Sequence, residues 1–176
     1  TMGTLDESWS KRFTSQDGTW SGNVFDFYFK TNTNLTTNFY DSNQYSKPTL
    51  TSTVAASSFQ EALINALVHA DYYGDGGIVI EKEQDLLRFS NPGLFRVPIE
   101  QALQGNISNL RNPNLFKMFI LIGLCKRTGS GLKNLKASWD DFRADAFDLI
   151  QDSGSERTVL TLHYKQKVFE KEELIE

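Results

Sequence analysis

One stretch of the sequence decides the fold: SFQEALINALVHAD, residues 58–71. Its apolar residues recur three and four positions apart, which is the period of an amphipathic helix. Ser57 or Ser58 is the expected N-cap, because Glu61 follows Ser58 at the spacing of a capping box. We expect this helix to run to about Asp71.

The residues after this helix have the pattern of a β-hairpin. A glycine-rich turn at residues 74–77 leads to two apolar runs, residues 78–82 and 86–90, which the polar residues 83–85 separate. Short apolar runs bounded by turn residues are typical of paired strands. The sequence therefore predicts a helix-turn-hairpin unit.

Three more helices and one more strand are expected further along the chain. Asn91-Pro92-Gly93 should stop the second strand, and a short helix should span about residues 98–103. The helix expected at 115–124 is almost continuously apolar, which indicates burial on more than one side. A helix at 132–139 and an alternating strand at 157–164 complete the pattern.

The first third of the chain leaves alternatives open. Phe25, Tyr28 and Phe29 share a helical face, whereas Phe25, Phe27 and Phe29 share the face of a strand. Between residues 31 and 58, 16 of 28 residues are Ser, Thr or Asn. This composition indicates an edge hairpin or a loosely held arm.

Composition and charge restrict the function. The 176 residues are 39% hydrophobic, which is enough for one folded core. The net charge of −4 disfavours direct binding of nucleic acid. One cysteine and two histidines leave neither an internal disulfide nor a Cys/His zinc cluster. No apolar run reaches the length of a membrane span. We expect a cytoplasmic protein with no membrane partner.

Glu61, Asn65 and His69 are the first candidates for chemistry. On a helix, residues four apart share a face, so Glu61 and Asn65 project side by side, with His69 one turn further on. A carboxylate and an amide so placed suit the polarisation of water and the binding of magnesium. Structural roles stay open for Glu61 as a capping-box residue and for His69 as a backbone-bonded imidazole. Asn65 is a poor helix former whose polar atoms need partners.

A second candidate is Gly129-Ser130-Gly131, directly before the expected helix at 132–139. Free backbone N–H groups at a helix N-terminus attract phosphate. A simple turn with Ser130 as N-cap explains the same residues. Lys126 and Arg127 next to it are expected to be solvated charges at a helix end, with contact to phosphate as the less favoured alternative.

Four motifs in order carry a resemblance to a known family. They are EALINALVHADY at 61–72, FSNPGLF at 89–95, RNP at 111–113 and RTGSGL at 127–132. Residues 17–164 thereby resemble the C-terminal ATPase-like domain of RecG-related transcriptional regulators. That family is a branch of the GHKL superfamily, which includes gyrase B, sensor histidine kinases and MutL. The resemblance implies the Bergerat fold: an α+β, two-layer α/β sandwich with a mixed sheet and helices on one face.

The resemblance also implies ATP and Mg²⁺ as ligands. Glu61 matches the general base that orients the attacking water, and Asn65 matches the residue that binds magnesium. The segment from about Leu94 to Arg127 matches the ATP lid.

Two glycine-containing boxes of the family contact the nucleotide. Asn91 and Gly93 fall at the box that contacts adenine, where the superfamily begins with Asp. Gly129 and Gly131, with Ser130 between them, fall at the second box, which meets the phosphates.

We expect three parts in this chain. Residues 1–55 form an aromatic arm with a Ser/Thr/Asn-rich extension, residues 56–165 the ATPase-like domain, and residues 166–176 a charged tail or linker. Relatives carry a nucleic-acid-contacting domain upstream and often a winged helix downstream. The resemblance therefore implies a piece of a longer regulator that reaches nucleic acid only through a domain absent from this chain.

The expected function is an ATP-binding, nucleotide-controlled switch, with magnesium-dependent hydrolysis as its enzymatic form. Helicase activity is not expected, because the chain has no G-x-x-x-x-G-K-[ST] loop. The alternative is a degenerate, non-catalytic module of the same fold that forms a homodimer through its aromatic arm. Direct DNA binding is the least favoured function.

Overall fold

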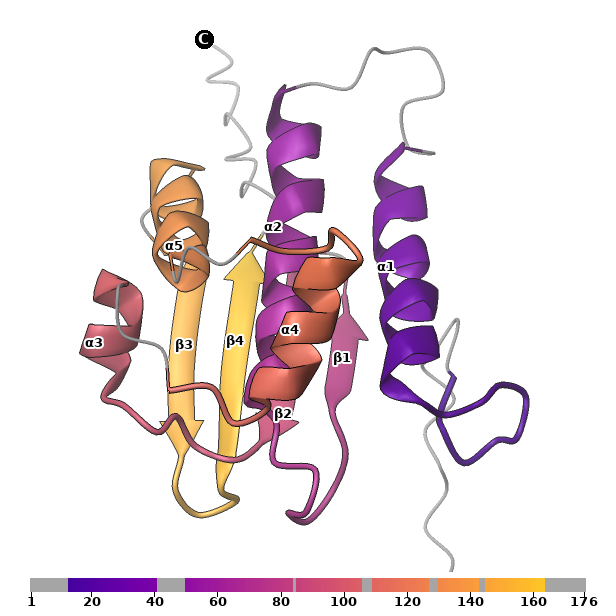
Figure 1. Ribbon diagram of the computed structural model, residues 1–176. Coiled ribbons are helices and arrows are strands. Elements are labelled where there is room, and N and C mark those ends of the chain that lie inside the picture. Colours follow the sequence, from indigo (N-terminus) through magenta and orange to yellow (C-terminus); the bar gives the residue numbers. More distant parts are fainter. Residues whose placement is uncertain are drawn as a thin grey trace, which may run out of the picture.

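A computed structural model describes residues 13–40, 50–83, 85–105, 109–126, 130–142 and 145–163 of the chain. A four-stranded sheet is covered by helices (Figure 1). In chain order the elements are α1 (Val24–Tyr40), α2 (Leu50–His69), β1 (Val79–Lys82), β2 (Leu86–Pro92), α3 (Ile99–Gln104), α4 (Pro113–Leu121), α5 (Gly131–Phe142), β3 (Phe147–Asp152) and β4 (Arg157–His163).

The sheet has the order β1-β2-β4-β3. Two hairpins, β1 with β2 and β3 with β4, lie side by side, and β2 pairs with β4. The α+β class is confirmed. The expectation of a mixed sheet is wrong for the described strands, since each of their pairs is antiparallel. Within each hairpin the turn reverses the direction of the chain.

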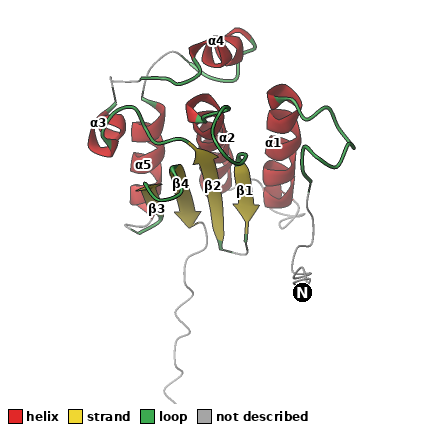
Figure 2. Cartoon of the chain, turned by 90° about the horizontal axis from the view of Figure 1, so that it is seen from below, coloured by secondary structure: helices red, strands yellow, loops and turns green. Residues whose placement is uncertain are grey.

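The helices form the second layer of a two-layer sandwich, as expected. In Figure 2 the helices α5, α2 and α1 form a row on one face of the sheet. The alternate residues of β2 that face them, Leu87 and Phe89, are buried, as are Leu160 and Leu162 of β4. Phe59 and Leu63 of α2 are fully buried against this layer. The core therefore lies between α2 and the two central strands.

The prediction of a hairpin or loose arm over residues 31–58 is wrong for its described part. α1 continues to Tyr40, and α2 already begins at Leu50. Polar side chains of α1 bond to the preceding turn: Asn34 Nδ2 donates to the carbonyl of Lys30 at 2.6 Å, and Thr36 Oγ1 donates to that of Asn32 at 2.8 Å. These local bonds let a Thr/Asn-rich segment remain helical.

The start of α2 was also predicted wrongly. Ser57 and Ser58 lie inside the helix, so neither is an N-cap and Glu61 is not part of a capping box. The Ser57 hydroxyl instead donates to the carbonyl of Val54 at 3.0 Å, and Ser58 is buried. The helix ends at His69, close to the expected Asp71.

The apolar helix α4 is not buried on several sides as predicted. Of its side chains only Phe119 is buried, whereas Met118 and Leu121 are 58% and 84% exposed. α4 lies at the outside of the helical layer (Figure 2), so it has one packed side. Gly123, with a positive φ of 79°, follows its C-terminus.

The remaining elements agree with their predictions within a few residues. The helix-turn-hairpin unit is confirmed, with β2 continuing through Pro92, and α3, α5 and β4 lie where they were expected. The sequence analysis gave no prediction for β3. The charged tail lies outside the described residues. The division at residue 55 stays a prediction, although α2 runs through that position.

Candidate functional site

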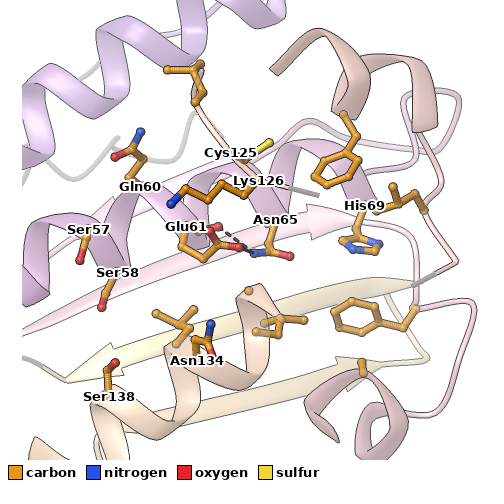
Figure 3. Close-up of a pocket in the computed structure, with 18 of the residues that line it drawn as sticks. Ser57, Ser58, Gln60, Glu61, Asn65, His69, Cys125, Lys126, Asn134 and Ser138 are labelled. Carbon is orange, nitrogen blue, oxygen red and sulfur yellow. Dashed lines mark hydrogen bonds between the residues drawn. The ribbon is translucent and has the colours of Figure 1, made fainter. Parts of the chain in front are cut away.

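A cavity of about 400 Å³ lies beside α2, and the three candidate residues of this helix are among those that line it. Glu61, Asn65 and His69 are four residues apart, so they form one row along the helix (Figure 3). The facing wall comes from α5 and from the segment between β2 and α5. The i, i+4 spacing predicted from the sequence therefore does place these three side chains at one cavity.

Glu61 and Asn65 form a hydrogen-bonded pair in this cavity. Asn65 Nδ2 donates to Glu61 Oε1 at 2.9 Å and to the backbone carbonyl of Glu61 at 2.8 Å. Burial raises the pKa of Glu61, and the bond from Asn65 opposes that rise. The carboxylate is thus a stronger base than an exposed glutamate. Because the amide nitrogen is engaged, Asn65 can offer its Oδ1 to a ligand.

Gly131, the first residue of α5, lies against the same carboxylate. A Cβ atom at this position would be 1.8 Å from Glu61 Oε1 and 2.7 Å from Glu61 Cδ. Any larger residue would displace the carboxylate, so only glycine lets the N-terminus of α5 come this close to Glu61. The structure therefore brings together Glu61, Asn65 and Gly131, which are 70 residues apart at most.

Ser130 is placed directly before α5. Its carbonyl accepts a bond from the backbone N–H of Asn134 at 2.9 Å, which is the first turn of the helix. Its hydroxyl accepts from Asn134 Nδ2 at 3.2 Å. Ser130 therefore holds the N-cap position. Gly129, the other predicted phosphate contact, lies outside the described residues.

Asn91 and Gly93 do not line this cavity. Asn91 is buried at the end of β2, directly opposite Thr158 of β4. Thr158 Oγ1 donates to the carbonyl of Gly93 at 2.8 Å. Gly93 has a φ of 94°, and a Cβ there would lie 3.0 Å from Asp71 and 3.1 Å from Arg111. Glycine is required at this position by the backbone and by close packing.

Arg111 and Asn112 hold the C-terminal end of α2, a role that the sequence analysis missed. The Arg111 guanidinium donates to the carbonyls of His69 at 3.3 Å and Leu94 at 2.8 Å, and it pairs with Asp71 at 3.3 Å. Asn112 Nδ2 donates to the carbonyl of Val68 in the last helical turn at 3.1 Å and to that of Ala70, directly after the helix, at 2.7 Å. These bonds satisfy carbonyls that a helix end leaves free.

His69 lies at the apolar end of the cavity. Its ring meets the ring of Phe95 edge to face, with 5.1 Å between centroids. Burial, helped by the charge of Arg111, lowers the pKa of His69 to about 4. The imidazole is therefore neutral at pH 7. Other apolar residues at the cavity are Val97, Ala102, Leu110 and Phe116.

The other part of the cavity is polar. Ser57, Ser58, Gln60, Asn134 and Ser138 line it. Lys126, for which a solvated charge was favoured over a phosphate contact, also lines it and lies near Glu61 in Figure 3. Cys125 is a further lining residue, and burial together with the charge of Glu61 raises the pKa of its thiol. Lys126 is the single Lys or Arg side chain of the cavity wall within the described residues.

The described residues contain no cluster of side chains that could bind a metal ion by themselves. Within the described ranges there is no group of three or more His, Cys, Asp or Glu side chains that could hold a metal ion. A search of the same residues for a helix both long and apolar enough to cross a membrane finds none.

The chain is similar to one family model and to a solved structure. Residues 75–161 match a family model described as "Putative ATP-dependent DNA helicase recG C-terminal", which confirms the expected resemblance for that segment. Glu61 and Asn65 precede the matched segment. No curated protein matches the chain.

A solved structure shares the fold. It is the DIP2311 protein from Corynebacterium diphtheriae, with a TM-score of 0.58 and 18% sequence identity. The alignment covers 77% of this chain and 28% of that protein. The aligned part of this chain therefore spans less than a third of the length of its structural relative, and at this identity the likeness concerns the fold alone.

Proposed function

Since residues 75–161 match the ATPase-like domain family of RecG-related proteins, we propose that this chain binds ATP with magnesium in the cavity beside α2. In this proposal the bound nucleotide acts as a switch for the longer protein. The observation that carries the proposal is the meeting of Glu61, Asn65 and Gly131 at one cavity.

The two ends of the cavity suit the two ends of a nucleotide. His69, Phe95 and Phe116 offer flat, apolar surfaces to a base. At the other end, Lys126 offers a positive charge and α5 offers its N-terminal N–H groups to phosphate. We therefore place the base toward His69 and the terminal phosphate toward Glu61.

Magnesium fits the donors present here. Mg²⁺ prefers oxygen ligands and usually keeps waters and substrate phosphates in its shell, so one protein oxygen is sufficient. Asn65 Oδ1 is that oxygen, because Asn65 Nδ2 is bonded to Glu61. When bound, the ion would neutralise charge on the phosphates.

Hydrolysis is assigned to Glu61. Its carboxylate would accept a proton from the water that attacks the terminal phosphate, and its raised pKa makes it a better base at neutral pH. Asn65 would keep the carboxylate oriented through the 2.9 Å bond. Residues 94–126, which supply Phe95, Phe116 and Lys126, would act as the lid over the nucleotide.

Isothermal titration with a non-hydrolysable ATP analogue and Mg²⁺ tests binding, and phosphate release from ATP tests hydrolysis. We expect saturable binding that Asn65→Ala weakens. Glu61→Ala should keep binding and abolish phosphate release. The control is Glu100→Ala on α3, an exposed glutamate that does not line the cavity. No binding at millimolar nucleotide would overturn the proposal, and unchanged turnover in Glu61→Ala would remove Glu61 as the base.

The non-catalytic alternative was predicted as a homodimer through the aromatic arm, but apolar side chains are also exposed on and directly after α4. Met118, Leu121 and Ile122 are each about half exposed or more, and such residues often mark interaction surfaces. Sedimentation of the chain and of Leu121→Lys tests this alternative. A dimer that Leu121→Lys dissociates, together with absence of nucleotide binding, would favour the interaction module.

A further inference from the structure

A second cavity, of about 760 Å³, is lined by α1, by α2 and by the edge strand β1. The segment before α1 also contributes to its wall. It shares no lining residue with the cavity that contains Glu61. Its volume is in the usual range of sites for small organic ligands. The molecule therefore has room for a second ligand that does not compete with a nucleotide.

Aromatic rings provide a large part of the apolar surface in this wall. Phe13, Trp20 and Phe27 form a cluster whose ring centroids are 6.1–6.4 Å apart. All three side chains line the cavity and are only partly buried, so ring surface is left for a ligand. Aromatic rings pack well against other rings in offset or edge-to-face geometry. The cluster therefore suits a ligand with a flat aromatic body.

One buried polar group in this wall lacks a partner. Thr31 is only 3% exposed, and its Oγ1 has no hydrogen-bond partner among the residues that the structure describes. Nearby polar groups of the wall are satisfied within the protein: Tyr72 Oη donates to the carbonyl of Leu67 at 2.9 Å. Trp20 Nε1 donates to the carbonyl of Thr14 at 2.7 Å. Because buried hydroxyl groups are normally bonded and Thr31 lines the cavity, a ligand there could supply the missing acceptor.

The charged side chains of the wall favour an uncharged ligand. Asp71 pairs with Arg111 at 3.3 Å. Glu81 pairs with Arg88 at 3.2 Å. Lys82, the remaining charged residue of the described wall, also interacts with another group of the protein. A charged ligand would lose hydration in this cavity without gaining a free counter-charge from the described wall, and an uncharged ligand avoids that cost.

We propose that this cavity is a second binding site, for an uncharged aromatic molecule that carries one carbonyl or hydroxyl oxygen. The aromatic body would pack against Phe13, Trp20 and Phe27. The oxygen would accept a hydrogen bond from Thr31 Oγ1. This site is independent of the proposed nucleotide site.

Fluorescence titration of the full chain with 6-propionyl-2-(dimethylamino)naphthalene, an uncharged naphthalene ketone, tests whether the site exists. We expect one saturable site per chain. ATP with Mg²⁺ should not displace the probe, because the two cavities share no lining residue. Absence of saturable binding would overturn the proposal, and displacement of the probe by ATP would overturn the separate site.

Competition by three naphthalenes of similar shape tests the chemistry of the ligand. 2-Acetylnaphthalene carries the oxygen, 2-ethylnaphthalene lacks it, and 2-naphthoate adds a negative charge. The ketone should bind about fivefold tighter than the hydrocarbon, the factor expected for one hydrogen bond of ordinary net strength. 2-Naphthoate should bind more weakly than the ketone, because its charge must be desolvated. Binding of 2-naphthoate as tight as that of the ketone would overturn the preference for an uncharged ligand.

Variants at Thr31 assign the hydrogen bond. Thr31→Val should bring the affinities for the ketone and the hydrocarbon together, whereas Thr31→Ser should keep the preference for the ketone. A damaged fold would weaken binding of both compounds alike, so the ratio of the two affinities reports the contact itself. An unchanged ratio in Thr31→Val would overturn the assignment of Thr31.

Phe27→Leu locates the aromatic body. It should weaken binding of the ketone and of the hydrocarbon by about threefold or more, because a ring contact is lost. The matched control is Phe25→Leu, also on α1, since Phe25 is 50% exposed and does not line the cavity. Unchanged affinity in Phe27→Leu, or an equal loss in the two variants, would overturn the proposed position of the ligand.

Discussion

Two cavities differ in how they are built: one of about 400 Å³ lies between α2 and α5, and one of about 760 Å³ is lined by α1, α2 and β1. The helices α5 and α1 flank α2 in Figure 2. The cavity at Glu61 contains a buried carboxylate that Asn65 holds and Gly131 touches. The cavity at Thr31 contains a hydroxyl without a described partner inside a mainly apolar wall. The fold fixes the polar groups of the cavity at Glu61. In the cavity at Thr31, one hydroxyl group is left without a hydrogen bond.

This difference predicts how substitutions at each cavity change the stability of the protein. Around Glu61, positions are set by close contacts, so larger side chains or lost bonds should destabilise the chain. Both Glu61 and Thr31 are polar groups whose burial is unfavourable. Replacing Glu61 by neutral glutamine, whose oxygen can still accept the bond from Asn65, or Thr31 by apolar valine should stabilise the empty protein, a common property of functional positions.

The largest effect is expected for Arg111→Ala. It removes bonds to the carbonyls of His69 and Leu94 and leaves Asp71 without its partner. Loss of these partly buried, charge-assisted bonds should lower the free energy of unfolding by about 3 kcal/mol. Urea denaturation measures this, with Arg88→Ala on the open face of the sheet as control, for which we expect less than about 1 kcal/mol. Equal losses in the two variants would show that α2 does not depend on Arg111.

Gly131→Ala should have the next largest effect. The added Cβ would overlap Glu61 Oε1, so the carboxylate must move and its bond to Asn65 must break. Overpacking of this kind should cost about 2 kcal/mol.

A double-mutant cycle of Gly131→Ala with Glu61→Ala measures how much of this loss of stability comes from the contact with the Glu61 carboxylate. If the clash is with the carboxylate, Gly131→Ala should become nearly neutral in the Glu61→Ala background. Gly77→Ala is the control, because no atom lies within 4 Å of a Cβ there. An additive cycle would contradict the described contact.

Glu61→Gln should stabilise the protein at neutral pH by on the order of 1 kcal/mol, the usual scale of a single substitution. Burial raises the pKa of Glu61 above its ordinary 4.5, so the native state binds its proton more tightly than the unfolded state does. The stability of the parent chain therefore falls as pH rises from about 4.5 through the native pKa, and the loss persists above it.

The advantage of Glu61→Gln should consequently be full at pH 8 and vanish below pH 4.5. Thermal unfolding of both chains across this range measures it. An advantage that is independent of pH would show that the carboxylate charge is not its cause.

Thr31→Val is the smallest predicted effect. Valine has nearly the same shape and removes the unsatisfied hydroxyl, so the free energy of unfolding should rise by about 1 kcal/mol without ligand. Thr36→Val is the comparison, because the Thr36 hydroxyl bonds to the carbonyl of Asn32 and its loss should not stabilise α1. A loss of stability in Thr31→Val would mean that Thr31 Oγ1 is satisfied in solution.

The sequence predicted those parts of the fold that depend on local pattern. Short apolar runs between turn residues predicted β1 and β2, and alternation predicted β4. The i, i+4 rule placed Glu61, Asn65 and His69 at one cavity. The aromatic residues at the start of α1 fitted a helix and a strand equally well, so local pattern could not decide between them. The continuation of α1 to Tyr40 was not predicted, because Thr and Asn are weak helix formers and their bonds to the preceding turn become visible only in three dimensions.

The parts of the fold and of the site that the sequence did not predict depend on contacts between residues far apart in the chain. Arg111 reaches His69 and Asp71 across about 40 residues, and Gly131 approaches Glu61 across 70. No spacing rule in the sequence reports such distances. The exposure of α4 was mispredicted for the same reason, since an apolar helix is buried only where another element covers it.

The bond from Arg111 to the carbonyl of Leu94 joins two residues that are 17 positions apart. Both ends of the intervening segment are thus tied to one point at the end of α2. The entropy of closing a loop grows slowly with its length, by about 0.6 kcal/mol for each doubling. The segment between Leu94 and Arg111 can therefore lengthen or shorten among relatives at little cost, while the helix that carries Glu61 and Asn65 keeps its place.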